Sequence, residues 1–117
     1  MDFNMFSSVL GKDPDMEVNL QKAKVLYFSM MNAIAMVKTG SYILTPKEIE
    51  FLSYIDEPDK ITMAPSNRHK MIKGLKDKGY IIETPDGYDY KVATRRFFDY
   101  LKNNPGHKIN GVYVKGA

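Results

Sequence analysis

The sequence predicts an α+β fold in which three core helices are followed by a β-hairpin, a short C-terminal helix and a strand. Three observations support this fold class. Residues 18–38 contain no proline or glycine and can form a long helix. Residues 45–48, Thr-Pro-Lys-Glu, have the composition of a helix start. Residues 85–87, Pro-Asp-Gly, separate two short segments of β-forming residues, as in a hairpin.

The composition is that of a single globular domain. The chain has 117 residues, of which 44% are hydrophobic and 26% charged, enough for one core without disulfides. The absence of cysteine excludes thiolate nucleophiles and zinc sites that need sulfur. No apolar run approaches the roughly 20 residues of a membrane span, and the first residues lack the basic start of a signal peptide. We therefore expect a cytoplasmic protein with no membrane association.

We divide the chain into an N-terminal arm (1–17), a domain (18–104) and a C-terminal strand or tail (105–117). The tail has strand character around an Asn-Gly turn and is expected to add to a sheet edge, its own or a partner's. The arm is expected to form a short helix that lies on its own domain or docks on a protein partner. Its apolar residues at helical spacing are Phe3, Phe6, Val9 and Leu10.

The helix at 18–38 is apolar on nearly every side. Between residues 25 and 37 only Ser29 and Asn32 are polar. Such a helix must be covered on most sides, and a short chain has few elements with which to cover it. We therefore expect a homodimer or larger assembly through residues 18–38, with a monomer as the alternative.

A short strand is expected at 41–44, followed by a helix at 45–55. Ile49, Leu52 and Ile55 recur at three-residue spacing and form the core face of that helix, which Phe51 widens, while its acids lie outside. Residues 56–59 then break the helix.

The next helix is expected at 66–79, with one apolar and one polar face, and is expected to end at Gly79. Its apolar residues share one arc of about 100°. Arg68 lies near the edge of that arc. The members of the buried arc are Met71, Ile72 and Leu75, and those of the opposite face are His69, Lys70, Lys73 and Lys76.

Strands are expected at 80–84 and 88–92, and a last helix at 94–103. In the second strand, apolar and charged residues alternate, which predicts that Asp89 and Lys91 face away from the apolar side of the strand. The residues expected to face inward are Tyr88, Tyr90 and Val92 from the strand and Phe97, Phe98 and Leu101 from the helix.

Charge is segregated along the chain. Residues 65–79 and 94–117 each carry five bases and one acid, whereas residues 46–64, before the first basic block, and 80–93, between the two, are acidic. A nucleic-acid-binding protein uses such basic blocks, although ordinary solvated faces have them too.

The order of these elements resembles that of a winged helix-turn-helix protein, with the nearest likeness to regulators of the MarR type. The likeness extends over about residues 20–93. Residues 44–52 are similar to the start of the helix that supports the DNA-reading pair, and residues 66–81 to a recognition helix running into its wing. MarR-like domains place a further short helix in between, where residues 56–65 here contain two prolines. Either that helix is missing, or the helix at 45–55 takes its part with an unusually long turn, the alignment we prefer.

The resemblance implies that double-stranded DNA is the partner. It assigns phosphate contacts to Lys70, Lys73 and Lys76. Asn67, Arg68 and His69, at the N-terminal turn of the same helix, are the residues best placed to reach base edges.

The wing is the least suitable part for DNA contact. Lys91 and the hairpin tip would lie along the backbone or minor groove, but three acids accompany this single base. These acids are Glu83, Asp86 and Asp89.

Catalytic signals are lacking in the sequence. His69 and His107 are the only histidines, and neither has a metal-ligand spacing. There is also no glycine-rich phosphate loop and no Gly-x-Ser-x-Gly motif. We therefore predict no enzyme activity, no cofactor and no metal site.

The first functional hypothesis is a dimeric, double-stranded DNA-binding regulator of transcription or replication, of phage or plasmid type. The alternative is a non-catalytic protein-interaction or assembly module, such as a phage adaptor or particle component. It would keep the winged-helix core and bind protein partners through its apolar helix and its two termini.

Overall fold

The computed structural model describes residues 15–116, and it confirms the α+β class. The element order over these residues is β1, α2, α3, η1, α4, β2, β3, α5 and β4. The helices are α2 (Leu20–Thr39), α3 (Pro46–Ser53), the short 3-10 helix η1 (Pro58–Lys60), α4 (Pro65–Asp77) and α5 (Val92–Asn103). The strands are β1 (Met16–Val18), β2 (Ile81–Thr84), β3 (Gly87–Tyr90) and β4 (Val112–Val114).

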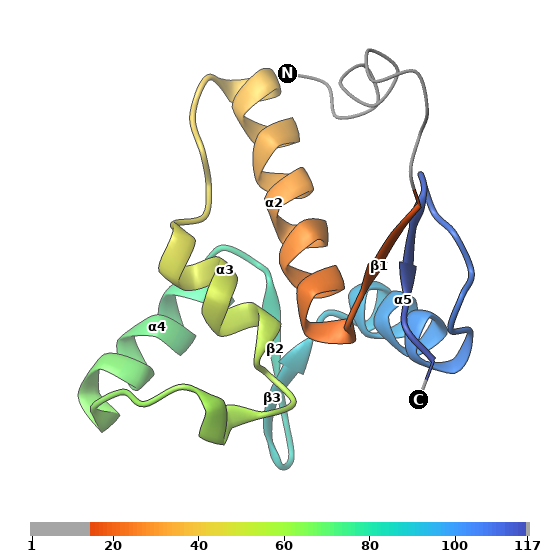
Figure 1. Ribbon diagram of the computed structural model, residues 1–117. Coiled ribbons are helices and arrows are strands. Elements are labelled where there is room, and N and C mark those ends of the chain that lie inside the picture. The colour runs from red at the N-terminus through yellow and green to blue at the C-terminus, as the bar shows by residue number, and fades with distance from the viewer. Residues whose placement is uncertain (1–14, 117) are drawn as a thin grey trace.

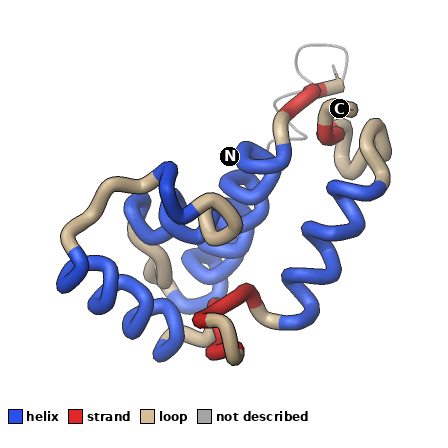
Figure 2. Tube along the Cα trace, turned by 90° about the horizontal axis from the view of Figure 1, so that it is seen from below, coloured by secondary structure: helices blue, strands red, loops and turns tan. Residues whose placement is uncertain are grey.

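The long helix α2 stands at the centre of the molecule (Figure 1). Helices α3 and α4 lie on one side of it, and α5 with the β1–β4 pair lies on the other. The view from below also places α4 and α5 at opposite sides, with the β2–β3 hairpin between them (Figure 2).

The hairpin formed where the sequence predicted it. Strands β2 and β3 are antiparallel, with Ile81 opposite Tyr90 and Thr84 opposite Gly87. Gly87 has a φ of 136°, a value that a side chain would strain. The predicted end of the preceding helix is also confirmed, because Gly79 has a φ of 84° and Tyr80 N–H donates to the Leu75 carbonyl at 2.9 Å.

Helix α3 begins with a complete capping box. The Thr45 hydroxyl accepts from Glu48 N–H, and the Glu48 carboxylate accepts from Thr45 N–H at 2.9 Å. The predicted core face is also present, since Phe51 and Leu52 are buried. The expectation that all acids of this helix lie outside was wrong for Glu48, which is buried because the cap and the Lys78 ammonium, 2.7 Å away, hold it inward.

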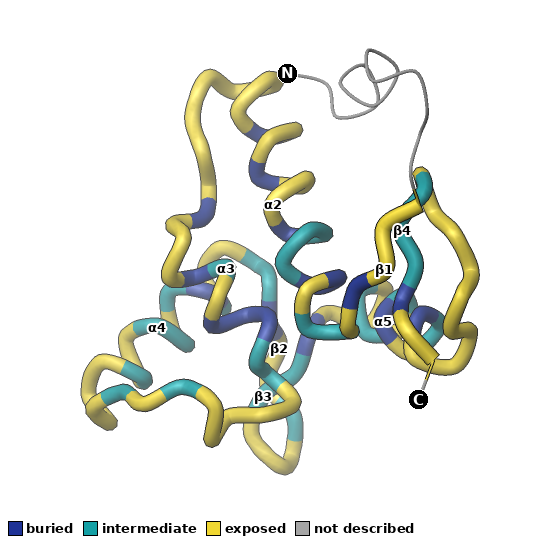
Figure 3. Tube along the Cα trace, in the orientation of Figure 1, coloured by how far each residue is buried: buried dark blue, intermediate teal, exposed yellow. Residues whose placement is uncertain are grey.

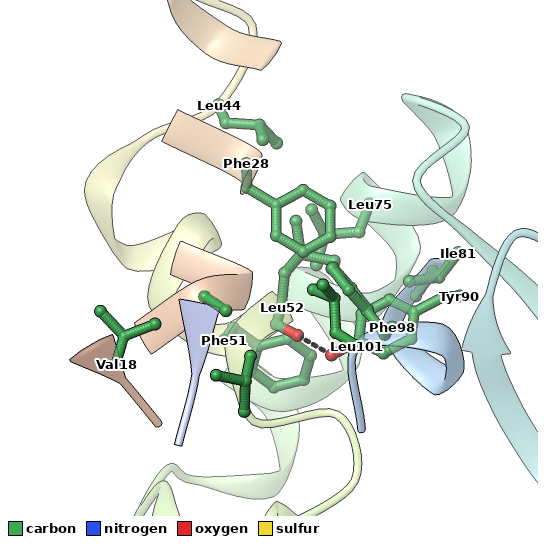
Figure 4. Packing of buried hydrophobic residues seen from close by; sticks show 12 residues of the cluster. Val18, Phe28, Leu44, Phe51, Leu52, Leu75, Ile81, Tyr90, Phe98 and Leu101 are labelled. Carbon is green, nitrogen blue, oxygen red and sulfur yellow. Dashed lines mark hydrogen bonds between the residues drawn. The ribbon is translucent and has the colours of Figure 1, made fainter. Parts of the chain in front are cut away.

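Aromatic side chains form most of the core. The rings of Phe28, Tyr90 and Phe98 pack on one another with centroids 5.0–6.0 Å apart. Leu52 and Leu75 close this cluster from α3 and α4 (Figure 4). The Tyr90 hydroxyl donates a hydrogen bond to the Leu52 carbonyl, which joins the hairpin to α3. These contacts set the positions of the hairpin and of all four long helices.

No strand forms at 41–44, contrary to the sequence expectation. The segment runs beside α2 as an extended loop, because the buried side chain of Asn32 takes its backbone hydrogen bonds. The Asn32 carbonyl oxygen accepts from Ile43 N–H and Leu44 N–H, both at 2.9 Å, and its amide donates to the Leu44 carbonyl at 3.0 Å. A single side chain thus replaces a strand partner.

The returning strand is shorter than expected. Strand β3 ends at Tyr90, and α5 begins at Val92, two residues earlier than predicted. Val92 therefore does not face the core and is 58% exposed. The Arg95 guanidinium binds Asp89, with Nε 3.1 Å from Oδ1, and this contact draws the first turn of α5 back toward β3.

The C-terminal tail pairs with a strand of its own chain, and the two form a separate two-stranded sheet. Strand β4 pairs in parallel with β1, Met16 opposite Val112 and Val18 opposite Val114. Val18 and Val114 are both buried against the core, so the last residues of the arm and the tail are parts of one packed unit. The predicted Asn-Gly turn is present, with positive φ at Asn110 and Gly111. The apolar arm residues Phe3, Phe6, Val9 and Leu10 lie outside the described residues.

Among the residues that the structure describes, other elements cover the C-terminal half of α2 on one side alone (Figure 3). Asn32 and Ala35 are buried there, while Met30, Ile34 and other apolar side chains are exposed. Within residues 15–116, none of the helices combines the length and the hydropathy that a membrane span requires.

We expect Asn32→Ala to lower the free energy of unfolding by about 2–3 kcal/mol, because it leaves backbone groups of Ile43 and Leu44 without partners. The measurement is urea unfolding followed by circular dichroism. The exposed Asn103 provides the control, and Asn103→Ala should change stability little. Equal stability of wild type and Asn32→Ala would contradict this account of the loop.

Candidate nucleic-acid interface

Helix α4 presents one face to the core and the opposite face to solvent. Leu75 is fully buried, and Met71 and Ile72 are half-buried and pack against the core cluster. Pro65 occupies the first helical position, which needs no backbone donor. The predicted division of α4 into an apolar and a polar face is therefore confirmed.

Four of the predicted site residues lie exposed on α4. They are Asn67, His69, Lys70 and Lys73. In the described part of the chain, neither Lys70 nor Lys73 has a carboxylate within ion-pair distance. Two uncompensated ammonium groups one turn apart on a helix form a local positive potential that attracts phosphate.

Arg68 points inward rather than toward solvent. Its Nη2 donates to the Ile61 carbonyl at 2.8 Å, and its guanidinium lies 5.9 Å from the centroid of the Phe51 ring. It thereby ties the segment between α3 and α4, including η1, to the first turn of α4. The sequence placed Arg68 at the edge of the buried arc, and this position was the signal that its side chain could turn toward the protein.

Lys76 and Lys91 have partners of their own. The Lys76 ammonium forms an ion pair with Glu83 of β2. The Lys91 ammonium lies 5.6 Å from the centroid of the Tyr80 ring, at the C-terminal end of α4. The seven predicted DNA-contacting residues therefore divide into four that are exposed on α4, two engaged at the hairpin end, and Arg68 turned inward.

Sequence reasoning missed one exposed base beside the N-terminal turn of α4. Lys60 lies in η1, which Arg68 holds close to α4 through a 3.5 Å contact with the Pro58 carbonyl. The acidic balance of residues 46–64 concealed it. The signal available was its position just before α4, but η1 itself could not be placed from sequence.

A second charged cluster lies on the α5 side of the molecule and was not foreseen. Lys24, whose side chain is 5% exposed, binds Asp56 at 2.9 Å. Asp56 also binds Arg95, whose two terminal nitrogens lie 3.0 and 2.6 Å from its oxygens, and Arg95 in turn binds Asp89. These residues join α2, the end of α3, β3 and α5.

This cluster borders an open pocket of about 610 Å³ that also includes Gln21, Ser53 and Lys102. The Arg95 hydrogen bond, opposed by partial burial and reinforced by Lys24, lowers the pKa of Asp56 to about 2. Such a carboxylate is a poor base at neutral pH. The charges of the cluster compensate one another, so we interpret it as a structural network that fixes α5.

Within residues 15–116, no group of three or more histidine, cysteine, aspartate or glutamate side chains could hold a metal ion.

The chain matches no protein-family model, and neither the curated proteins nor the solved structures include a match.

We expect Arg68→Ala to act on stability. Loss of the hydrogen bond to Ile61 and of the contact with Phe51 should lower the free energy of unfolding by about 1.5–3 kcal/mol. Asn67→Ala, one residue away and exposed, is the matched control and should be nearly neutral. Urea unfolding of both variants tests this, and an Arg68→Ala protein as stable as Asn67→Ala would contradict the inward role.

We expect the contribution of Asp56 to stability to depend on pH. Its pKa is lowered from 3.8 to about 2 on folding, so the stabilisation is complete well above pH 3.8 and is lost as the pH falls toward 2. Asp56→Asn should therefore be less stable than wild type by a constant amount above about pH 5, and the difference should shrink below about pH 4. Chemical unfolding at several pH values measures it, and a difference that persists unchanged at pH 2 would contradict the ion-pair assignment.

Proposed function

We propose that the protein binds double-stranded DNA through the exposed face of α4, as a winged-helix regulator. In this proposal α2, α3 and α4 form the three-helix core, and the β2–β3 hairpin is the wing. The observation that carries the proposal is the pair Lys70 and Lys73, exposed and without acidic partners within residues 15–116, on the helix that also exposes Asn67 and His69.

The positions of the exposed residues along α4 give them different roles in DNA binding. Lys70 and Lys73 neutralise phosphates and supply affinity that depends on salt but not on sequence. Asn67 and His69 lie in the first turn and a half of the helix, the part that enters deepest when a recognition helix lies in the major groove. An asparagine amide can make two hydrogen bonds to adenine there, so Asn67 is the main candidate for sequence readout.

The wing is less repulsive to DNA than its three acids suggest. Glu83 is paired with Lys76, and Asp89 is paired with Arg95. Asp86 remains exposed at the tip of the hairpin. Binding is therefore assigned to α4, with Lys91 as a further backbone contact and no reading of the minor groove by the tip.

The connection between α3 and α4 is long for a helix-turn-helix pair. Residues 54–64 span it, with η1 in the middle. The contacts of Arg68 with Ile61 and Phe51 supply the rigidity that a tight turn gives in other proteins of this architecture. This supports the alignment in which α3 is the first helix of the pair.

The second candidate function is the protein-interaction or assembly module. The exposed apolar side chains of α2 favour it, because monomeric proteins rarely leave such residues grouped on their surface. Under this hypothesis DNA would not bind at low salt, and a protein partner would occupy α2 instead.

We expect Lys70→Ala and Lys73→Ala each to weaken binding to a random duplex DNA pool and to lower the slope of log K against log salt by about one. The measurement is a titration between about 50 and 200 mM salt, by mobility shift or fluorescence anisotropy. Asn67→Ala should instead change sequence preference while keeping the salt slope.

Arg96→Ala is the matched control, because it removes one exposed positive charge from α5, on the other side of the molecule. It should leave both affinity and slope nearly unchanged. If Arg96→Ala and Lys70→Ala weakened binding equally, binding would depend on the net charge of the protein and not on α4. If the wild type did not bind DNA at about 50 mM salt, the proposed function would be wrong.

A further inference from the structure

The C-terminal half of α2 has an apolar face that the rest of the described chain does not cover. Val37 is 87% exposed and Met30 is 55% exposed, and Tyr42 in the following loop is 62% exposed. The exposed large apolar side chains here are Met30, Met31, Ile34, Met36, Val37, Tyr42 and Ile43.

The spacing of these residues is that of a helix-pairing seam. Met30, Ala33 and Val37 are exposed and separated by three and four residues, and we call them the α2 row. The buried residues Phe28, Asn32 and Ala35 occupy the opposite side of the helix. A repeat of alternating three and four residues keeps one face of a helix against a partner helix. Ala33, in the middle of the row, lets a second backbone approach closely.

Three exposed apolar side chains lie close together around the C-terminal half of α2. At 100° per residue, Met30, Ile34 and Val37 fall within an arc of about 60°, and they are 55%, 43% and 87% exposed. Monomeric proteins rarely leave large apolar side chains grouped in this way. A standard interface buries about 800 Å² on each partner, of which this group would form the apolar centre.

We propose that a second copy of this chain covers the α2 row, with the two α2 helices antiparallel about a two-fold axis near Ala33. Met30 of one protomer then lies against Val37 of the partner subunit. A two-fold interface brings the same surface together twice, so it must tolerate meeting itself. The row satisfies this condition, because α2 has no charged residue between Lys24 and Lys38. Any other partner would need an apolar surface of its own, whereas a second copy supplies one by symmetry.

The proposed dimer leaves α4 accessible. The side of α2 that carries Phe28 and Asn32 faces α3 and the loop before it, and the α2 row lies on the opposite side. Dimerisation and DNA binding therefore use different surfaces, and the dimer does not rest on the proposed function.

The test is the mass of the purified full chain by light scattering and sedimentation velocity. We expect twice the 13.4 kDa of one chain for the wild type, and 13.4 kDa for Val37→Glu. Val37 has almost no contact within its own protomer, so the variant should keep its circular dichroism spectrum. Val92→Glu is the matched control, since Val92 is also exposed but lies on α5, and it should remain dimeric. A wild type of 13.4 kDa, or a Val37→Glu protein that stays dimeric, would overturn the proposal.

Two further experiments test the antiparallel arrangement of the α2 helices and the identity of the segment that covers the α2 row. The chain has no cysteine, so Ala33→Cys introduces a single thiol near the proposed axis, and mild oxidation should link two chains covalently. A dimeric protein that does not crosslink at this position would overturn the antiparallel arrangement. A monomeric wild type that dimerises only after deletion of residues 2–12 would assign the row to the chain's own N-terminal segment and overturn the second copy.

Discussion

The ring packing and the hydrogen bond of buried Tyr90 are the interactions on which the rest of the structure depends. Tyr90 is 1% exposed, its ring packs on Phe28 and Phe98, and its hydroxyl donates to the Leu52 carbonyl. Burial raises the pKa of the phenol, so it remains a neutral hydrogen-bond donor at every physiological pH. One residue of the hairpin thus fixes α2, α3 and α5 relative to one another, and the core is built around it.

The position of α4 follows from this core and from two further contacts. Leu75 inserts into the aromatic cluster, and β2 continues directly from the end of the helix into the hairpin that Tyr90 anchors. Arg68 fixes the other end of α4 against the chain that precedes it. Because both ends are held, the exposed lysines keep a defined spacing and direction, as a phosphate-binding face requires. A recognition surface on a rigid helix loses little conformational entropy when it binds.

Much of this architecture was predictable because its signals are local. The cap residues around Thr45, the glycine after α4 and the Pro-Asp-Gly turn each fix a short stretch of backbone by their own chemistry. What sequence reasoning missed depends on partners far along the chain. Asn32 binds a loop 11 and 12 residues away, and Arg95 meets Asp56 across 39 residues.

The same distinction applies to the candidate site. Helical periodicity correctly selected the outward face of α4, because that face is a property of the helix alone. The base contact assigned to Arg68 overlooked its place beside the buried arc, from which the long side chain reaches Ile61 and the Phe51 ring, and the pairing of Glu83 with Lys76 was not foreseen.

The central claim is that the exposed face of α4 is where DNA binds, and the most direct measurement is a titration of the isotopically labelled protein with duplex DNA, followed by amide chemical shifts. At about 50 mM salt, we expect the largest changes at Asn67, His69, Lys70 and Lys73, with smaller ones along the hairpin and none on the outer side of α5. Changes confined to the exposed half of α2, or a spectrum that DNA leaves unaltered, would contradict the account.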